Sequence, residues 1–425
     1  MRKLVRPTCN QALTMITQDA FTIGKMVINS VLTKFKNLSK KQSEFILEIL
    51  LLLMSMRGRC NFLQMSREGS RTEKSFRYQF EKTFDWLSFN VELIKAYCSP
   101  EMVIGFDPSY IKKSGKHSHG LGYFYSGCQG RYAKGLELGS FAALDKAQHT
   151  AYHLEAIQSP SANRDRVNET TTLVDHYADI VLVRSEKLKE LSKTLVCDAY
   201  FTKKKFIDKV CDEAGFEVIG RMRDDANLRY IFKGKQKQGR GRRKIYDGKV
   251  DNKNIDKRRI RLIHEDSNCK IYSAIVNSLG LKRNIRVIHV EHRMKSKILR
   301  KIYYSTDVNR DPVELYEFYS LRFQMEFIFR DAKQHVGLEN CQARSKNKLH
   351  FHFNSTLTVV SIGKVISRYG KDLKGRIPFS LSDIKTELQN RNMLYRIFSM
   401  YRIDRKLIEI NSGYRNLLNF GKIAA

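Results

Sequence analysis

Long apolar runs are missing from this 425-residue chain. The longest run, at residues 49–54, is far shorter than the ~20 residues that a helix needs to cross a bilayer. The first residues, MRKLVRPTCNQALT, lack the apolar core of a signal peptide. The eight cysteines are scattered without a CxxC pair, so neither a zinc motif nor a disulfide framework is indicated. We therefore expect a reduced, cytoplasmic protein with no membrane association.

Negative charge is also scarce. The chain carries 44 Asp and Glu against 77 Lys and Arg, which gives a formal net charge of +33 and a pI near 9.8. An excess of this size points to a polyanionic partner, most often nucleic acid, with a membrane surface as the lesser option. The length and the 42% hydrophobic content are typical of a globular protein with two or three domains.

The stretch 311–337, DPVELYEFYSLRFQMEFIFRDAKQHVG, predicts one long helix with both ends marked. Asp311 is a good N-cap, and Pro312 suits the first helical position because its missing N–H costs nothing there. Glu314 would complete a capping box, and Gly337 would supply a left-handed stop.

Four polar residues of this helix, Tyr319, Arg322, Glu326 and Lys333, fall within an arc of roughly 60° at about 100° per residue. One stripe therefore combines a carboxylate, which could bind a metal ion, with two cations and a phenol, which could hold phosphates. DNA strand chemistry would need this combination. A surface helix with charges at i, i+4 spacing is the alternative.

Two further acids each follow a buried-strand pattern. The strand Met102–Phe106 runs into Asp107-Pro108, and the strand 194–197 ends at Asp198. Either Asp alone could be a helix cap or a turn former. The predicted order of elements, three strands, helix, strand, helix, strand and later the long helix, is the order of a ribonuclease-H-like α/β fold. That fold would bring Asp107, Asp198 and Glu326 together.

The spacing Y-x2-R-x3-E-x6-K, together with GFDPSYIKKSGK and VCDAYFTKKKF, resembles the three acid blocks of DDE transposases of bacterial insertion sequences, in the cut-and-paste branch that forms DNA hairpins. The resemblance implies that Asp107, Asp198 and Glu326 are catalytic and bind two Mg²⁺ ions, with Mn²⁺ as a substitute. It implies that Tyr319, Arg322 and Lys333 hold the phosphates of the terminal nucleotides.

The same resemblance implies an enzyme that binds the terminal inverted repeats of its element, cleaves the ends through hairpins and joins the 3′-OH ends to target DNA. A homodimer on paired ends is the expected active form. Three alternatives stay open: a DNA-binding relic without activity, a metal-dependent nuclease that only cuts, and a basic RNA-binding protein, although no RNA-recognition signature is present.

Residues 1–98 predict a helical DNA-binding domain. A short helix near 61–65, a turn at Glu68-Gly69 and a helix from the capping box Ser70–Glu73 outline a helix-turn-helix at about 57–82. Its candidate DNA contacts are Arg71, Lys74 and Arg77. A helical bundle with a solvated basic face is the alternative.

The catalytic core is expected at 99–231 and 306–370, interrupted by a β-rich insertion at 232–305 with four short strands. The insertion opens with the basic run 233–244, which has no apolar residue; Arg240, Arg242 and Arg243 within it are candidate phosphate contacts. The resemblance also implies an aromatic platform for a flipped base, for which Tyr246 or Tyr272 would have to serve. Residues 371–425 predict a C-terminal helical region that either supports dimerisation or packs on its own core.

Overall fold

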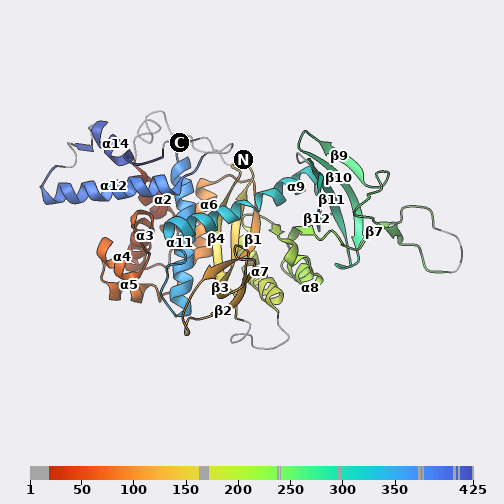
Figure 1. Cartoon of the computed structure of the whole chain (residues 1–425), viewed down its shortest axis with the longest axis horizontal. Helices are drawn as coiled ribbons and strands as arrows, with labels where there is room; N and C mark the ends of the chain where they lie inside the picture. Colours follow the sequence, from red (N-terminus) through yellow and green to blue (C-terminus); the bar gives the residue numbers. More distant parts are fainter. Residues whose placement is uncertain are drawn as a thin grey trace.

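The computed structural model describes residues 19–161, 172–236, 239, 241–293, 298–371, 375, 378–404, 408–409 and 412–423. Helices gather at one end, strands run through the middle, and a second group of strands forms the other end (Figure 1). The expected mixed α/β class is confirmed. Across the described residues, no helix is both long enough and apolar enough to cross a membrane.

The N-terminal part contains five described helices: α2 (Ala20–Leu32), α3 (Lys40–Ser55), α4 (Phe62–Glu68), α5 (Glu73–Gln79) and α6 (Trp86–Tyr97). The Phe80 ring lies 4.5 Å from the Phe351 ring and 5.1 Å from the Phe62 ring, measured between centroids. The capping box predicted from Ser70 is wrong. Thr72 caps α5 by accepting a hydrogen bond from the Ser75 N–H, and Ser70 instead donates to Glu48.

The strands form one mixed sheet in the order β2-β3-β1-β5-β6-β12-β11-β10-β7-β8, with β4 paired to β3 and β9 to β10. Their bounds are β1 (Met102–Lys112), β2 (Gly122–Ser126), β3 (Arg131–Asp145), β4 (Thr150–Gln158), β5 (Thr194–Cys197), β6 (Glu217–Met222), β7 (Leu228–Ile231), β8 (Tyr246–Lys249), β9 (Arg261–Glu265), β10 (Cys269–Ser278), β11 (Arg283–Arg293) and β12 (Ile298–Ser305).

Strand β1 does not end at Phe106 as predicted. Its parallel ladder with β5 stops at Phe106↔Cys197, but its antiparallel ladder with β3 continues to Lys112↔Gly135. Pro108 is therefore a strand residue, paired with Gly139. Proline is tolerated there because β1 has no described partner on its other side beyond Phe106, so no ladder hydrogen bond is lost on that side.

The segment 232–305 continues the same sheet. The four expected strands are observed as β9, β10, β11 and β12, and β12 pairs antiparallel with β6. The short strands β7 and β8 were not predicted, because four residues each give no readable alternation.

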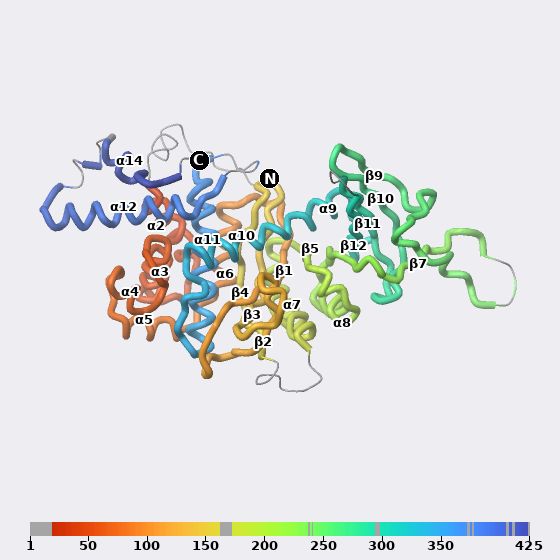
Figure 2. Tube along the Cα trace, viewed as in Figure 1, coloured from red at the N-terminus to blue at the C-terminus, as the bar shows by residue number. Residues whose placement is uncertain are grey.

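The remaining helices cover the two faces of the sheet and the ends of the molecule. They are α7 (Leu173–Lys189), η1 (Ala199–Phe201), α8 (Lys204–Asp208), η2 (Lys209–Glu213), α9 (Pro312–Leu321), α10 (Gln324–Asp331), η3 (Ala332–Val336), α11 (Lys346–Arg368), α12 (Leu381–Met400) and α14 (Ser412–Asn419). Helix α9 contacts β3, β5 and β6 as well as β9 to β12, so it joins the two groups of strands (Figure 2).

The single helix predicted at 311–337 is wrong in its middle. Asp311 caps α9 and Gly337 ends the stretch with φ 75°, as expected, but Glu314 pairs with Arg310 instead of forming a capping box. Backbone hydrogen bonds switch to i→i−3 around Arg322, which separates α9 from α10. A π-helical turn, η3, then follows α10.

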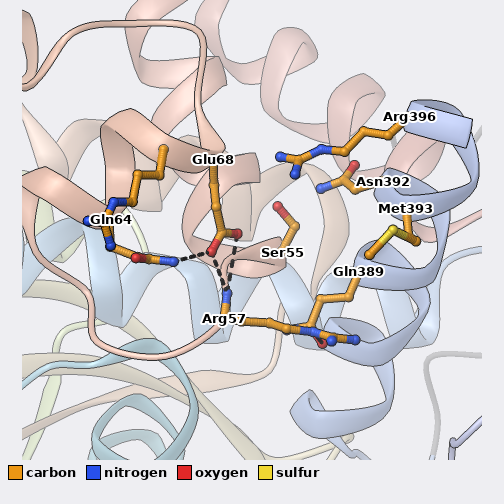
Figure 3. Close-up of a pocket in the computed structure, with 9 residues that line it drawn as sticks. Ser55, Arg57, Gln64, Glu68, Gln389, Asn392, Met393 and Arg396 are labelled. Atoms are coloured by element: carbon orange, nitrogen blue, oxygen red, sulfur yellow. Dashed lines mark hydrogen bonds between the residues drawn. The ribbon is translucent and has the colours of Figure 1, made fainter. Parts of the chain in front are cut away.

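Helix α12 packs against α2, α3 and α11 of its own chain. A hollow of about 310 Å³ lies between α12 on one side and the end of α3, the following loop and α4 on the other (Figure 3). There Arg57 donates to Gln389 Oε1 at 2.9 Å and, through its backbone N–H, to the Glu68 carboxylate. Helix α12 is thus anchored to the N-terminal helices.

Candidate active site

The three predicted acids line one cavity of about 1050 Å³. Asp107 and Asp198 directly follow the paired residues Phe106 and Cys197 on neighbouring parallel strands, so they lie side by side at one edge of this part of the sheet. Glu326 comes from the first turn of α10. Strand ends and a helix start therefore bring together acids that are far apart in sequence.

Helix α10 reaches β1 because β1 has a glycine at the contact. A Cβ added to Gly105 would lie 2.7 Å from the Met325 Sδ atom. Side chains alternate along a strand, so Asp107 faces the same side as Gly105, toward α10. Phe106 faces the other side and packs on Tyr177 of α7 at 5.4 Å between ring centroids.

The carboxyl group of Asp107 has a raised pKa. Its side chain is 17% exposed. Burial raises its pKa to about 7, the Arg322 guanidinium opposes this rise, and the negative charges of Asp198 and Glu326 add to it. The three carboxylates are therefore close enough to repel one another, which is the environment that a cation would relieve.

Arg322 holds Asp107 from behind the cavity. Its Nη1 lies 3.1 Å from Asp107 Oδ2, and its buried Nε has no hydrogen-bond partner among the residues that the structure describes. The Tyr319 ring lies 5.8 Å from the Arg322 guanidinium carbon and 4.5 Å from the Tyr303 ring centroid. The arginine and the two tyrosines thus pack together next to the acid, with the two rings tilted at 45° to each other.

Lys333 lines the acid cavity from the π-helical turn η3. Its Nζ donates to the Tyr110 carbonyl at 2.8 Å and lies 3.7 Å from a Glu339 oxygen. Because a π turn inserts one residue into the helical repeat, η3 changes the direction of the residues that follow α10. The stripe predicted for Tyr319, Arg322, Glu326 and Lys333 assumed one regular helix, so it does not give the position of Lys333.

The carboxylates fit a divalent metal by their chemistry, since clustered acidic oxygens are the ligands that Mg²⁺ prefers. Their spacing is wider than that of a single closed ligand shell: over the described ranges, the oxygens of Asp107, Asp198 and Glu326 do not all lie within 4.8 Å of one another. Asp107 faces Arg322, and an Asp198 oxygen accepts the backbone N–H of Ala199.

The other predicted DNA contacts that the structure describes do not line the acid cavity. Arg71 pairs with Glu48 and Arg77 with Glu73, whereas the Lys74 side chain is exposed. In the basic run, Arg242 and Arg243 are exposed, and Arg240 lies outside the described residues.

The sequence did not single out a group of aromatic rings around the acid cavity. They are Tyr123 (63% exposed), Tyr125 (55%), Tyr132 (71%), Tyr200 (44%) and Phe323 (51%). Tyr123 and Tyr125 occupy alternate positions of β2, which is the signal that could have revealed them.

The two tyrosines considered for a base platform are poorly placed for it. Tyr272 is only 4% exposed, and the Arg229 guanidinium covers the Tyr246 ring at 3.7 Å.

The sequence was compared with models of known protein families and with curated proteins. Residues 120–362 match the family described as transposase DDE domain. Asp198 and Glu326 lie within the matched region, and Asp107 precedes it. The comparison with curated proteins gave no match. Since the match covers more than half of the sequence, the chain belongs to the DDE transposase family.

Proposed function

We propose that this transposase binds the terminal inverted repeats of an insertion sequence, cleaves the element's ends and joins the freed 3′-OH ends to target DNA. The observation that carries the proposal is the single cavity lined by Asp107, Asp198 and Glu326. DNA is the substrate that the family implies, and a net charge of +33 suits a phosphate backbone.

We also assign the catalytic core to a ribonuclease-H-like fold, at residues 99–231 and 306–370. The strand order β4-β3-β1-β5-β6, with β1, β5 and β6 parallel and the others antiparallel, supports this assignment. The segment 232–305 is then an insertion, residues 1–98 a DNA-binding domain with a helix-turn-helix at about 57–82, and 371–425 a candidate dimerisation region.

Asp107, Asp198 and Glu326 would hold divalent metal, with Mg²⁺ preferred and Mn²⁺ as a substitute. Bound divalent ions supply Lewis-acid stabilisation of charge at phosphorus and an activated oxygen nucleophile. Asp107 must lose its proton to act as a ligand, and its pKa of about 7 means that this loss occurs near neutral pH. Arg322 keeps the charge of Asp107 compensated while the site is assembled.

The side chains around the acids would hold the DNA. Lys333 offers an ammonium to a phosphate at the cavity wall. Tyr319 and Arg322 pack together and support Asp107. The exposed rings of Tyr123 and Tyr132 offer stacking faces for bases. A homodimer on paired ends, with hairpin intermediates, would allow both ends to be cut in concert.

The deciding experiment incubates the purified protein and Mg²⁺ with a labelled duplex that carries the inverted repeats flanking its own gene. Cleavage at the repeat boundary is expected, with loss of cleavage and retention of binding in Asp107→Asn and Glu326→Gln. Glu317→Gln, an exposed change on α9, is the matched control and should cleave normally. A hairpin product would assign the protein to the hairpin-forming, cut-and-paste branch of the family.

Other outcomes of the same assay select the alternatives. Cutting without joining to a target would make the protein a nuclease, and binding without cutting would make it a DNA-binding relic. Stronger competition by RNA than by duplex DNA would contradict the proposal. Lys333→Ala should reduce cleavage and weaken binding to the repeat end, and unchanged values for both would remove Lys333 from the site.

A further inference from the structure

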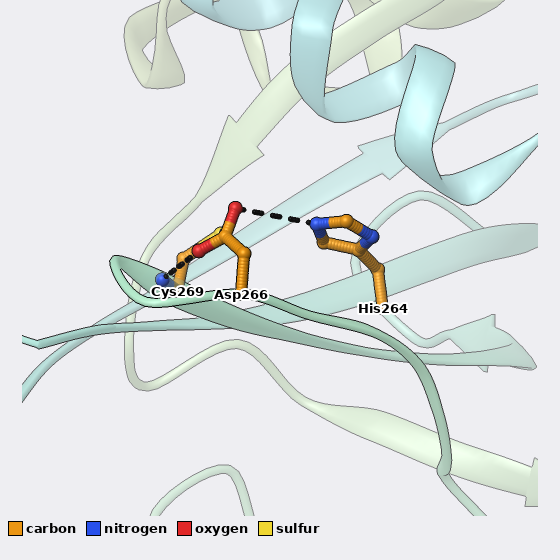
Figure 4. Close-up of side chains that lie close together, drawn as sticks. All are labelled: His264, Asp266 and Cys269. Atoms are coloured by element: carbon orange, nitrogen blue, oxygen red, sulfur yellow. Dashed lines mark hydrogen bonds and ion pairs between the residues drawn. The ribbon is translucent and has the colours of Figure 1, made fainter.

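Three potential metal ligands meet at the turn between β9 and β10, in the sequence His264-Glu-Asp266-Ser-Asn-Cys269 (Figure 4). The His264 Nε2 atom lies 3.3 Å from Asp266 Oδ2, and the Cys269 sulfur lies 3.8 Å from the same oxygen. All three ligand atoms lie within 4.8 Å of one another. Among the described residues this is the one such group, and it is on different strands from the catalytic acids.

The distances match a tetrahedral zinc site. Nitrogen, oxygen and sulfur ligands bind zinc at about 2.0–2.3 Å, so in a tetrahedron their atoms are roughly 3.3–3.8 Å apart. The two distances from Asp266 Oδ2 lie within that range. The other oxygen, Asp266 Oδ1, accepts the backbone N–H groups of Asn268 and Cys269, which fixes the carboxylate with Oδ2 toward the two neighbours.

The register of the sheet supplies a fourth candidate. Cys269 pairs with His292 of β11, and paired residues point to the same face of a sheet. Asp266 is bonded to Cys269 from the other side, through Asp266 N–H and Cys269 C=O at 2.9 Å. Asp266, Cys269 and His292 therefore form a row across three strands, with His264 two residues along on the same face.

Tyr316 belongs to α9, the helix that contacts β9, β10 and β11. Its ring lies 5.8 Å from the His292 ring.

We propose that His264, Asp266 and Cys269 bind one zinc ion and that this ion fastens β9 to β10 beneath α9. His292 is not among the ligand atoms that lie within 4.8 Å of one another in the described residues, so its imidazole would have to turn toward the ion to become the fourth ligand and tie in β11. The thiolate and imidazole ligands select zinc over the hard cations that suit the carboxylate cavity. Binding replaces the Cys269 S–H bond by a bond from sulfur to zinc and releases the proton to solvent. The inference goes beyond the proposed function and does not depend on it.

The test uses the full-length protein without DNA, stripped of metal by a chelator and titrated with Co²⁺, a coloured substitute for Zn²⁺. The expected result is one equivalent of Co²⁺ with a thiolate-to-cobalt charge-transfer band and tetrahedral visible bands, displaced by Zn²⁺. Cys269→Ser should abolish the charge-transfer band. His264→Gln changes a partly exposed side chain and should weaken binding by at least the roughly 10–100-fold typical of losing an outer-shell partner.

Two controls separate this site from the acid cavity. Cys128 lines that cavity and is the alternative thiolate, so Cys128→Ser must keep the charge-transfer band. Glu326→Gln must keep it as well, whatever its effect on DNA cleavage. A band that survives Cys269→Ser, or Co²⁺ uptake with no band in the parent protein, would overturn the proposal.

Discussion

Raising the pH should destabilise the metal-free protein through Asp107. The pKa of this acid in the folded protein is about 7, against 3.8 for the free side chain. Between these values the folded protein keeps a proton that the unfolded chain releases, so stability falls as the pH rises. This contribution is fully present below about pH 4 and is lost by about pH 7. A shift of about 3 pH units corresponds to about 4 kcal/mol in the free energy of unfolding.

The measurement is urea unfolding of chelator-treated protein across pH 4.5–7.5, for the parent protein and for Asp107→Asn. Asparagine is neutral at every pH and also changes the contact with Arg322, so the slopes and not the absolute values are compared. The parent protein should lose up to about 1.4 kcal/mol per pH unit more than the variant. Comparing the two proteins removes the contribution of other acids with raised pKa values, such as Glu137 and Asp145.

Mg²⁺ should restore most of the lost stability above pH 7, because a divalent ion takes the place of the proton among the carboxylates. Equal slopes for the two proteins would refute the reasoning, since they would mean that Asp107 titrates normally. Glu326→Gln gives a further check: removal of one neighbouring charge should lower the pKa of Asp107 and make the pH dependence shallower.

Two more changes test how the site is built. Gly105→Ala should reduce cleavage and cost about 1–3 kcal/mol of stability, because the new Cβ would lie 2.7 Å from Met325 Sδ and would push α10 away from β1. Gly280→Ala, with nothing within 4 Å, is its control, and equal activity of the two would contradict this account. Arg310→Ala should cost about 3 kcal/mol in urea unfolding, because it leaves the 13% exposed Glu217 without its cation. A loss below about 1 kcal/mol would show that this pair behaves like a surface ion pair.

Local signals predicted much of the candidate site. The buried strand before Asp198, the N-cap at Asp311 and the left-handed Gly337 depend on neighbouring residues alone, and all three are present. The convergence of the acids on one cavity followed from the order of the elements, because parallel strands end at one edge.

The sequence could not predict features that depend on packing. The break between α9 and α10 at Arg322 has no Gly or Pro to mark it. Ser70 has the pattern of a cap but donates to Glu48, 22 residues away, and Thr72 takes its place. The row of Asp266, Cys269 and His292 exists only once the register of three strands is known, so spacing along the chain could not reveal it.

The pairing of β12 with β6 gives the segment 232–305 a protective role. Without it, β6 would present the N–H and C=O groups of residues 219–222 to solvent, an open edge on which a strand of another molecule could pair. The added strands move the free edge outward to β8 and β9. β8 has only four residues, carries Asp247 and Lys249 and is bent by Gly248 at φ 91°, and β9 has five residues that include Arg261 and Glu265. Such an edge is a poor template for aggregation. A shortened protein that lacks this segment would therefore need a new cover for β6 to avoid aggregation through this edge at high concentration.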